Sequence, residues 1–256
     1  MTIRIAMWSG PRNISTAMMR SFGARPDTAV SDEPFFGAYL ALSGAPHPMS
    51  AETVASMDCD FASVRDAMSG SAPDGQPIWY QKHMAHHMVG EVSLLDMPDH
   101  RHAFLIRTPE RVAASYAAKN ALTEPEVLGY AQMRRYFEAE ADRLGRAPAV
   151  VDADDILADP AGTLASLCAA LEIAWTEAML TWKEGPHSED GVWGAHWYAS
   201  VNASTTFAPP PRTMPVLSPE HQAIAAACQA DYAALHRYRL TGERAERPTG
   251  RTKHDV

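Results

Sequence analysis

An apolar strand, a glycine-containing loop and the start of a helix follow one another in the stretch Ile3-Arg4-Ile5-Ala6-Met7-Trp8-Ser9-Gly10-Pro11-Arg12-Asn13-Ile14-Ser15-Thr16. Backbone N–H groups of such a turn, together with the positive dipole end of the helix, bind anions such as phosphate. Arg12 adds a permanent cation, and the hydroxyls of Ser15 and Thr16 fall in the first helical turn. The motif lacks the second glycine and the Gly-Lys-Ser/Thr ending of a Walker A loop. An ordinary turn in which Ser15 and Thr16 cap the helix is the alternative. The sequence therefore predicts a phosphate-binding turn made of Gly10, Pro11, Arg12, Asn13, Ile14, Ser15 and Thr16.

A second segment has the same strand-to-helix character. The apolar run from His102 to Ile106 is followed by Arg107, and Thr108-Pro109-Glu110 is typical of a helix start. Arg107 should then lie at the carboxyl end of a strand, which in a parallel sheet is the ligand-binding edge. Ser115 follows about two helical turns later and can face the same crevice. A surface ion pair for Arg107 and a packing role for Ser115 are the alternatives.

Strand and helix patterns alternate along the chain. We expect parallel strands near residues 3–8, 28–32, 78–82, 102–107 and 148–152, with helical patterns between them. This alternation predicts an α/β fold: a three-layer sandwich with a mostly parallel central sheet and a P-loop-like phosphate-binding turn.

Residues 1–240 are expected to form a single domain. Residues 43–77 are rich in Pro, Ser, Ala and Asp and are interpreted as an insertion or lid over the active-site edge. Helical patterns extend over residues 126–144 and from Ser218 onward. Residues 241–256 are polar without apolar periodicity and are expected to be a disordered tail.

Composition restricts the partners. The 256 residues carry 22 Lys and Arg against 31 Asp and Glu, a net charge of −9, which disfavours nucleic acid and anionic membranes. A nucleotide needs only a local positive pocket and stays possible. No signal peptide or apolar run of membrane-spanning length is visible, so we expect a cytoplasmic location. Three scattered cysteines are typical of reduced thiols rather than of disulfides or a zinc site.

Together, the two anion-binding segments and the run from Val150 to Pro160 resemble the sulfotransferase superfamily. Ser9–Thr16 is similar to its loop for the 5′-phosphosulfate of 3′-phosphoadenosine 5′-phosphosulfate, and Ile106–Tyr116 to its element for the 3′-phosphate. The resemblance covers roughly residues 1–210. It implies this donor, with 3′,5′-ADP as product, a small-molecule acceptor and no metal.

Two further segments resemble a bacterial and plant subgroup of that superfamily. These are Asp32-Glu33-Pro34-Phe35 and Asp190-Gly191-Val192-Trp193-Gly194-Ala195-His196-Trp197-Tyr198. Plant members are often labelled aminotransferase-like, but we find no strand-and-loop context for a pyridoxal phosphate lysine at any of the chain's four lysines. The aromatic cluster around Trp193, Trp197 and Tyr198 could stack on a ligand or pack internally.

Sulfuryl transfer needs a cation at the bridging oxygen and a base for the acceptor hydroxyl. The resemblance assigns the cation to Arg12, in a charge-stabilising role. Glu33 is a candidate base, since it matches a carboxylate segment of a bacterial relative and follows a strand that should lie close to the phosphate loop. Gln81-Lys82-His83 follows the third predicted strand, where better-known cytosolic members have Lys-Thr-His with His as base, so Lys82 and His83 are candidates too. Between Glu33 and a histidine of residues 83–87 the sequence leaves the choice open.

Three other interpretations stay open. A metal clamp from His83 and His87 lacks a visible third ligand. A P-loop kinase would use Asp152 as a magnesium ligand but lacks the Walker lysine. A non-catalytic nucleotide-binding module is compatible with the same motifs.

Overall fold

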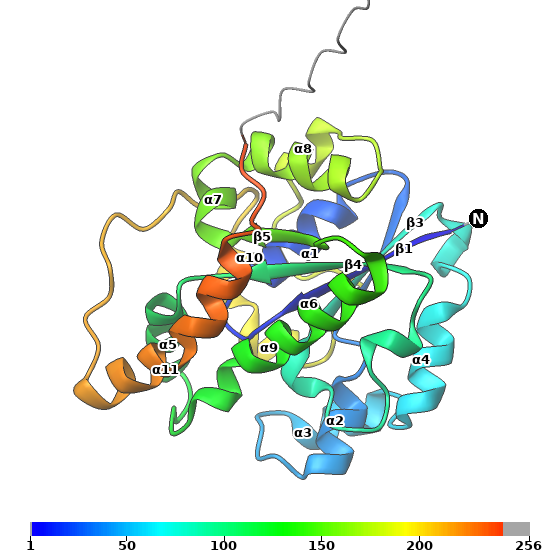
Figure 1. Cartoon of the computed structure of the whole chain (residues 1–256). Coiled ribbons are helices and arrows are strands. Elements are labelled where there is room, and N and C mark those ends of the chain that lie inside the picture. Colours follow the sequence, from blue (N-terminus) through cyan, green and yellow to red (C-terminus); the bar gives the residue numbers. More distant parts are fainter. Residues whose placement is uncertain (1, 243–256) are drawn as a thin grey trace, which may run out of the picture.

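A five-stranded parallel sheet lies at the centre of the computed structural model, which describes residues 2–242. The strand order is β2-β3-β1-β4-β5 (Figure 1). The strands are β1 (Ile3–Ser9), β2 (Thr28–Asp32), β3 (Ile78–Met84), β4 (His100–Ile106) and β5 (Ala149–Asp152). All four pairings are parallel, which confirms the predicted α/β fold.

Helices cover both faces of this sheet (Figure 1). They are α1 (Ser15–Gly23), α2 (Phe36–Ser43), α3 (Ser50–Ser56), α4 (Phe61–Ser69), α5 (Pro109–Ala117), α6 (Tyr130–Leu144), α7 (Ala153–Ala158), α8 (Pro160–Ala170), α9 (Gly194–Trp197), α10 (Ala199–Asn202) and α11 (Pro219–His236). Short 3₁₀ turns are η1 (Pro73–Gly75), η2 (Ala85–His87), η3 (Leu94–Asp96), η4 (Pro125–Leu128) and η5 (Glu177–Leu180). Helices α1, α7 and α8 pack on one face, and α5, α6 and α11 pack on the other.

The central strand explains why the layers form. Along β1, Ile5 and Met7 enter one core cluster while Ala6 and Trp8 enter the other, and all four side chains are fully buried. Successive side chains of a strand point to opposite faces, so a continuously apolar strand needs helices on both sides. The result is a three-layer sandwich with every strand's carboxyl end at one edge.

Three predicted boundaries were wrong, and one of them is the start of β4, which begins at His100 rather than near residue 102. Strand β3 continues to Met84, two residues past the predicted end, because the pairing of β1 with β3 extends to Ser9 and Met84. The helical pattern of residues 126–144 divides into η4 and α6 at Gly129, whose φ of 77° lies in the left-handed region.

The predicted insertion, residues 43–77, contains α3, α4 and η1. Its first residues, from Ser43 to His47, line the cavity described below, and α3 packs against α2. The single domain and the lid both stay predictions. The predicted disordered tail falls mostly on residues 243–256, which lie outside the described residues. Within residues 2–242, no helix is both long enough and apolar enough to cross a membrane.

Candidate active site

A cavity of about 980 Å³ opens at the carboxyl edge of the sheet. This volume is at the upper end of the ~300–1,000 Å³ typical of small-molecule sites. Residues that follow four different strands line it: Arg12 after β1, Glu33 after β2, His87 after β3 and Arg107 after β4. Because parallel strands end at the same edge, positions distant in sequence meet here.

The turn after β1 forms one wall of the cavity, through residues 11–17. Gly10 permits its path, because a Cβ there would lie 2.4 Å from the carbonyl oxygen of Leu128. Helix α1 begins with Ile14 at its N-cap position and no side-chain cap, so its first N–H groups have no side-chain acceptor. Neither Ser15 nor Thr16 caps the helix, contrary to the alternative considered above. The buried Asn13 Oδ1 beside this turn has no hydrogen-bond partner among residues 2–242.

Arg12, Arg107 and Ser115 meet beside the α1 N-terminus. Arg12 Nε donates to Ser115 Oγ at 3.1 Å, and Arg107 Nη1 donates to the Arg12 carbonyl oxygen at 3.2 Å. Within the described part of the chain neither arginine forms an ion pair, and Arg107 Nε is buried without a partner. Burial, and then the nearby charge of Arg107, lower the pKa of Arg12. Two guanidinium groups that form no ion pair among residues 2–242, beside a helix N-terminus, make a site suited to anions, although Asp154 and Asp152 are near enough to act on the pKa of Arg107.

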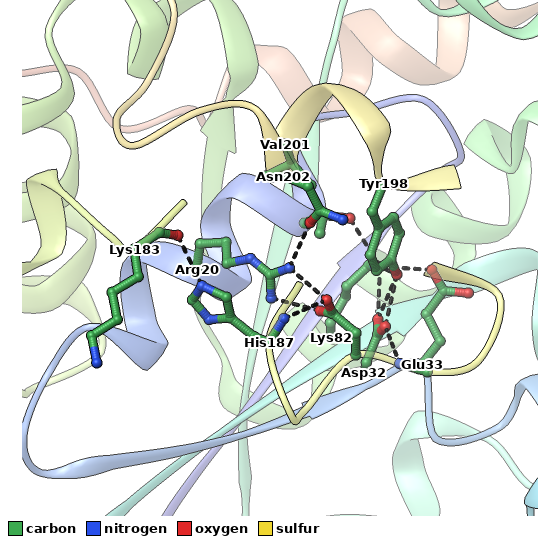
Figure 2. A network of polar contacts seen from close by, with 12 residues as sticks. Arg20, Asp32, Glu33, Lys82, Lys183, His187, Tyr198, Val201 and Asn202 are labelled. Atoms are coloured by element: carbon green, nitrogen blue, oxygen red, sulfur yellow. Dashed lines mark hydrogen bonds and ion pairs between the residues drawn. The ribbon is translucent and has the colours of Figure 1, made fainter. Parts of the chain in front are cut away.

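Lys82 is the centre of a buried polar network (Figure 2). Its Nζ lies 2.8 Å from Asp32 Oδ1, 2.7 Å from Glu33 Oε1 and 2.7 Å from Tyr198 Oη. It also lies 3.2 Å from Thr16 Oγ1, in the first turn of α1. Burial opposes the charge of Lys82, but Asp32 and Glu33 outweigh it and raise its pKa well above the ordinary value. Lys82 therefore stays an ammonium group and joins β2, β3, α1 and Tyr198.

Glu33 occupies the boundary between this network and the cavity. Burial raises its pKa, with Asp32 adding to the effect and Lys82 opposing it. Its Oε2 lies 3.9 Å from His87 Nδ1. A carboxylate with a raised pKa, beside a cavity, is suited to accept a proton near neutral pH.

Strand β3 lies between β2, which precedes Glu33, and β1, which precedes the turn of residues 10–16. Glu33 and that turn are nevertheless close, because Lys82 Nζ contacts both Glu33 Oε1 and Thr16 Oγ1. Lys82 lies between the two elements, because its strand pairs with both neighbours: Lys82 is opposite Asp32 of β2 and opposite Met7 of β1.

His83 lies on the opposite face of β3 from Lys82. It is 1% exposed, stacks on Trp8 with ring centroids 4.6 Å apart, and contacts Gln81 Oε1 through Nε2. It does not line the cavity. The reason is that side chains alternate along a strand. The predicted end of β3 at residue 82 left His83 outside the strand, whereas His83 continues the strand and points to the face opposite Lys82. Within residues 2–242 no group of three or more His, Cys, Asp or Glu side chains could hold a metal.

Aromatic rings and two histidines form the other end of the cavity. The His87 ring stacks on Phe36 at 4.5 Å and on Tyr39 at 4.8 Å, and His86 packs against His87 edge-on. Trp197 lines the same region. The Nδ1 atoms of both histidines and Nε1 of Trp197 are buried without a partner among the described residues. This wall offers apolar faces together with unused hydrogen-bonding atoms.

Asp152 has a structural role in this fold. It accepts a hydrogen bond from Asp154 N at 2.8 Å, as the N-cap of α7, and another from Tyr232 Oη at 2.9 Å. It is 2% exposed and does not line the cavity. Its two oxygens are therefore used within the fold.

Sequence reasoning missed Asp32 as a site component, named His87 only within the histidines of residues 83–87, and gave Tyr198 only as part of an aromatic cluster. Asp32 ends a strand directly before Glu33, and that position was a usable signal. Tyr198 lies more than one hundred residues from Lys82, and no sequence spacing connects them. Trp193, of the same aromatic cluster, is 2% exposed and donates through Nε1 to Tyr198 Oη at 3.1 Å, so it packs internally.

Comparison with known proteins identifies the family. A family model described as a sulfotransferase domain matches residues 3–237. The chain belongs to the sulfotransferase domain family. This confirms the resemblance carried by the two anion-binding segments.

Two plant proteins from Arabidopsis thaliana are similar in sequence. Branched-chain-amino-acid aminotransferase-like protein 1 is 37% identical over 216 residues, and protein 2 is 35% identical over 218 residues. Each match covers 83% of this chain but 38% of the plant protein. The plant names belong to proteins of which this chain spans little more than a third, so they assign no activity here.

Solved sulfotransferase structures share the fold. The sulfotransferase from Alicyclobacillus acidocaldarius has a TM-score of 0.52 at 14% identity and covers 93% of this chain and 96% of its own. The sulfotransferase domain of the olefin synthase from Synechococcus PCC 7002 has a TM-score of 0.50 at 16% identity, covering 88% and 94%. At these identities the likeness concerns the fold.

Proposed function

We propose that this sulfotransferase-family protein transfers a sulfuryl group from 3′-phosphoadenosine 5′-phosphosulfate to a hydroxyl of a small-molecule acceptor. The observation that carries the proposal is the pair Arg12 and Arg107, partly buried and free of ion pairs among residues 2–242, in one cavity with the buried carboxylate Glu33. Such a cavity has an anion-binding end and a proton-accepting end.

The anion-binding end matches the donor's two charged positions. The turn of residues 10–16 and the start of α1 suit the 5′-phosphosulfate, since they supply N–H groups, Arg12 and the Thr16 hydroxyl. Arg107 and Ser115 suit the 3′-phosphate, because both line the cavity on the β4 and α5 side. The unused donor Arg107 Nε is a group that a phosphate oxygen would satisfy.

Glu33 is the base we propose for the acceptor. The acceptor's O–H bond breaks and its proton moves to Glu33 Oε2 while the acceptor oxygen bonds to sulfur. The bond from sulfur to the bridging oxygen breaks, and 3′,5′-ADP leaves with that electron pair. Arg12 and Lys82 stabilise the negative charge that develops on the bridging oxygen. Glu33 then releases its proton to solvent.

The aromatic wall of Phe36, Tyr39 and Trp197 would receive the acceptor. This role follows from its place near Glu33, because His87 lies 3.9 Å from Glu33 and stacks on Phe36 and Tyr39. A kinase-like reaction is less well supported, because Asp152 is already hydrogen-bonded within the fold. The cytoplasmic location expected from the sequence stays a prediction.

Ligand-induced thermal stabilisation tests the donor site directly. With EDTA present, 3′,5′-ADP should raise the melting temperature more than 5′-AMP does, because only the former carries a 3′-phosphate for Arg107. Binding adds about 2.7 kcal/mol of apparent stability at one hundred times the dissociation constant. Arg107→Ala should remove the difference, whereas Arg135→Ala, an exposed arginine on α6, should keep it.

Two outcomes would count against 3′-phosphoadenosine 5′-phosphosulfate as the sulfuryl donor. Equal shifts from 5′-AMP and 3′,5′-ADP would remove the case for a 3′-phosphate site. A shift from ATP that requires magnesium would favour the kinase-like reaction. Incubation with labelled donor and a panel of hydroxylated metabolites then tests turnover.

A further inference from the structure

Two carboxylates share one ammonium group at the inner end of the cavity. Asp32 and Glu33 both contact Lys82 Nζ, at 2.8 and 2.7 Å. The side chains of Asp32 and Lys82 are each 1% exposed. One positive charge cannot fully compensate two buried negative charges, so the two carboxylates compete for it.

The hydrogen bonds divide unequally between the two carboxylates. Tyr198 Oη lies 2.9 and 2.7 Å from the two oxygens of Asp32, and Gly191 N donates to Asp32 Oδ2 at 3.1 Å. With Lys82, three donors converge on Asp32 (Figure 2). Trp193 Nε1 and the register pairing of Asp32 with Lys82 hold these donors in place.

Fewer hydrogen-bond donors contact Glu33 than contact Asp32. Lys82 contacts its Oε1, and no donor among residues 2–242 is hydrogen-bonded to its Oε2. Its side chain is 12% exposed and lines the cavity, whereas Asp32 does not. When a proton enters this network, Glu33 is therefore the carboxylate with an oxygen free to receive it.

We propose that Asp32 is a positioning residue that keeps the negative charge and the larger share of Lys82, and so leaves Glu33 available to accept the acceptor's proton. The role of Glu33 rests on the proposed function, but the division of charge does not. The charged and titratable groups that face Glu33 are Lys82 from β3, Asp32 from β2, His87 from η2 and Tyr198 beside α9. The pKa of His87 is lowered by burial, so it is neutral and leaves Lys82 as the cation.

The test is a carboxyl titration by NMR on protein labelled with ¹³C at the side-chain carboxyls of Asp and Glu. The Glu33→Gln variant identifies the Glu33 signal. Asp32→Asn removes the negative charge that competes for Lys82. The Lys82 ammonium group then interacts mainly with Glu33, so Glu33 should titrate at lower pH than in the wild type. Asp142→Asn, the same charge change at an exposed position on α6, should leave the Glu33 titration unchanged. An unchanged or upward-shifted Glu33 titration in Asp32→Asn would overturn the proposal.

Should Asp32→Asn fail to fold, the wild-type titration decides alone. Glu33 must take up its proton above the ordinary glutamate pKa, because it shares Lys82 with Asp32, and a Glu33 titration at or below that pKa refutes the proposal. In an active preparation, the acid limb of kcat against pH should also move to lower pH in Asp32→Asn. Because the titration needs neither donor nor acceptor, absence of sulfuryl transfer would refute the proposed function while the charge assignment is still tested.

Discussion

Arg12 and Glu33 share a backbone conformation that is uncommon for residues with a side chain. Their φ angles are 57° and 45°, in the left-handed region that favours glycine. Such conformations cost about 1–3 kcal/mol each and cluster at functional sites. Both residues follow a strand end and line the cavity. The geometry of the turn, rather than local preference, thus places the two candidate catalytic side chains.

Replacement of the two arginines should separate binding from chemistry. Arg107→Ala should weaken 3′,5′-ADP binding about 10- to 100-fold, as expected for loss of a charged hydrogen bond, with kcat little changed at saturating donor. Arg12→Ala should also lower kcat about 10²–10³-fold, because the bridging oxygen gains charge only as the S–O bond breaks. Steady-state kinetics at saturating donor measures both. Full kcat in Arg12→Ala would contradict a transition-state role.

Glu33→Gln should lower kcat by about 10²–10⁴-fold, the usual range for loss of a general base. The amide keeps the size of the side chain but cannot accept a proton. In the wild type, kcat should fall as pH drops through a pKa that burial holds above the ordinary glutamate value. His83→Gln is the comparison, since His83 lies on the far face of β3. An inactive His83→Gln enzyme that still binds 3′,5′-ADP, beside an active Glu33→Gln enzyme, would move the role to histidine.

At the scale of elements, one segment late in the chain completes the site. Residues 190–202 carry Tyr198 and Trp197 to the cavity and are fixed by a buried ion pair between Asp190 and Arg20 of α1. The pair is bidentate at 2.6 and 2.7 Å, with side chains 9% and 2% exposed. Asn202 also accepts from Arg20 at 3.1 Å. Helix α1, which follows the turn of residues 10–16, thus also anchors residues 190–202, whose Tyr198 contacts Lys82.

Asp190→Ala should lower the free energy of unfolding by about 3–5 kcal/mol, since it leaves the Arg20 guanidinium buried and unpaired. Glu138→Ala is the control, because its ion pair with Arg134 is largely exposed, and its effect should stay below about 1 kcal/mol. Urea denaturation followed by circular dichroism measures both variants. Equal effects of the two would show that the anchor contributes no more than a surface pair.

At the scale of the whole molecule, six histidines are held in their neutral form by burial. Burial lowers the pKa of each of them: His47, His83, His86, His87, His100 and His102. For His86, His100 and His102 the pKa falls to about 4. Three of the six lie around Trp8 and Gln81 on the sheet face away from the cavity, and the others lie at the aromatic wall.

The protein should therefore lose stability steeply in mild acid. Between the unfolded histidine pKa near 6.5 and the folded value near 4, the unfolded chain binds more protons, so the free energy of unfolding falls as pH falls. Each histidine contributes up to about 1.4 kcal/mol per pH unit. Glu33 and Asp152, whose pKa values burial raises, act in the opposite direction but are fewer.

Urea denaturation at a series of pH values from 7 to 4 measures this slope. His100→Gln should reduce it, whereas His221→Gln, in the first turn of α11 and outside the six, should not. A flat dependence across this range would show that the buried histidines are not held neutral in the folded state.

Sequence patterns predicted the strands and their parallel arrangement, and they placed Arg12 and Arg107 after strand ends at the edge where the cavity lies. These features depend on local patterns: an apolar run, a glycine that allows close approach, and polar residues at a strand end. They also sufficed for the family resemblance, which the match over residues 3–237 confirms. Local patterns carry this information because strand and helix periodicity repeats within a few residues.

Which side chains share the cavity depends on contacts between segments that are far apart in the sequence. Because side chains alternate along β3, Lys82 lines the cavity and His83 points to the other face of the sheet. The sequence did not predict this difference, because the predicted strand ended two residues too early. Strand order inserted β3 between the phosphate loop and Glu33, so Lys82 became the link. Tyr198 reached Asp32 through the anchored late segment. Such contacts depend on long-range packing and burial, and burial in turn sets the proton affinity of Glu33.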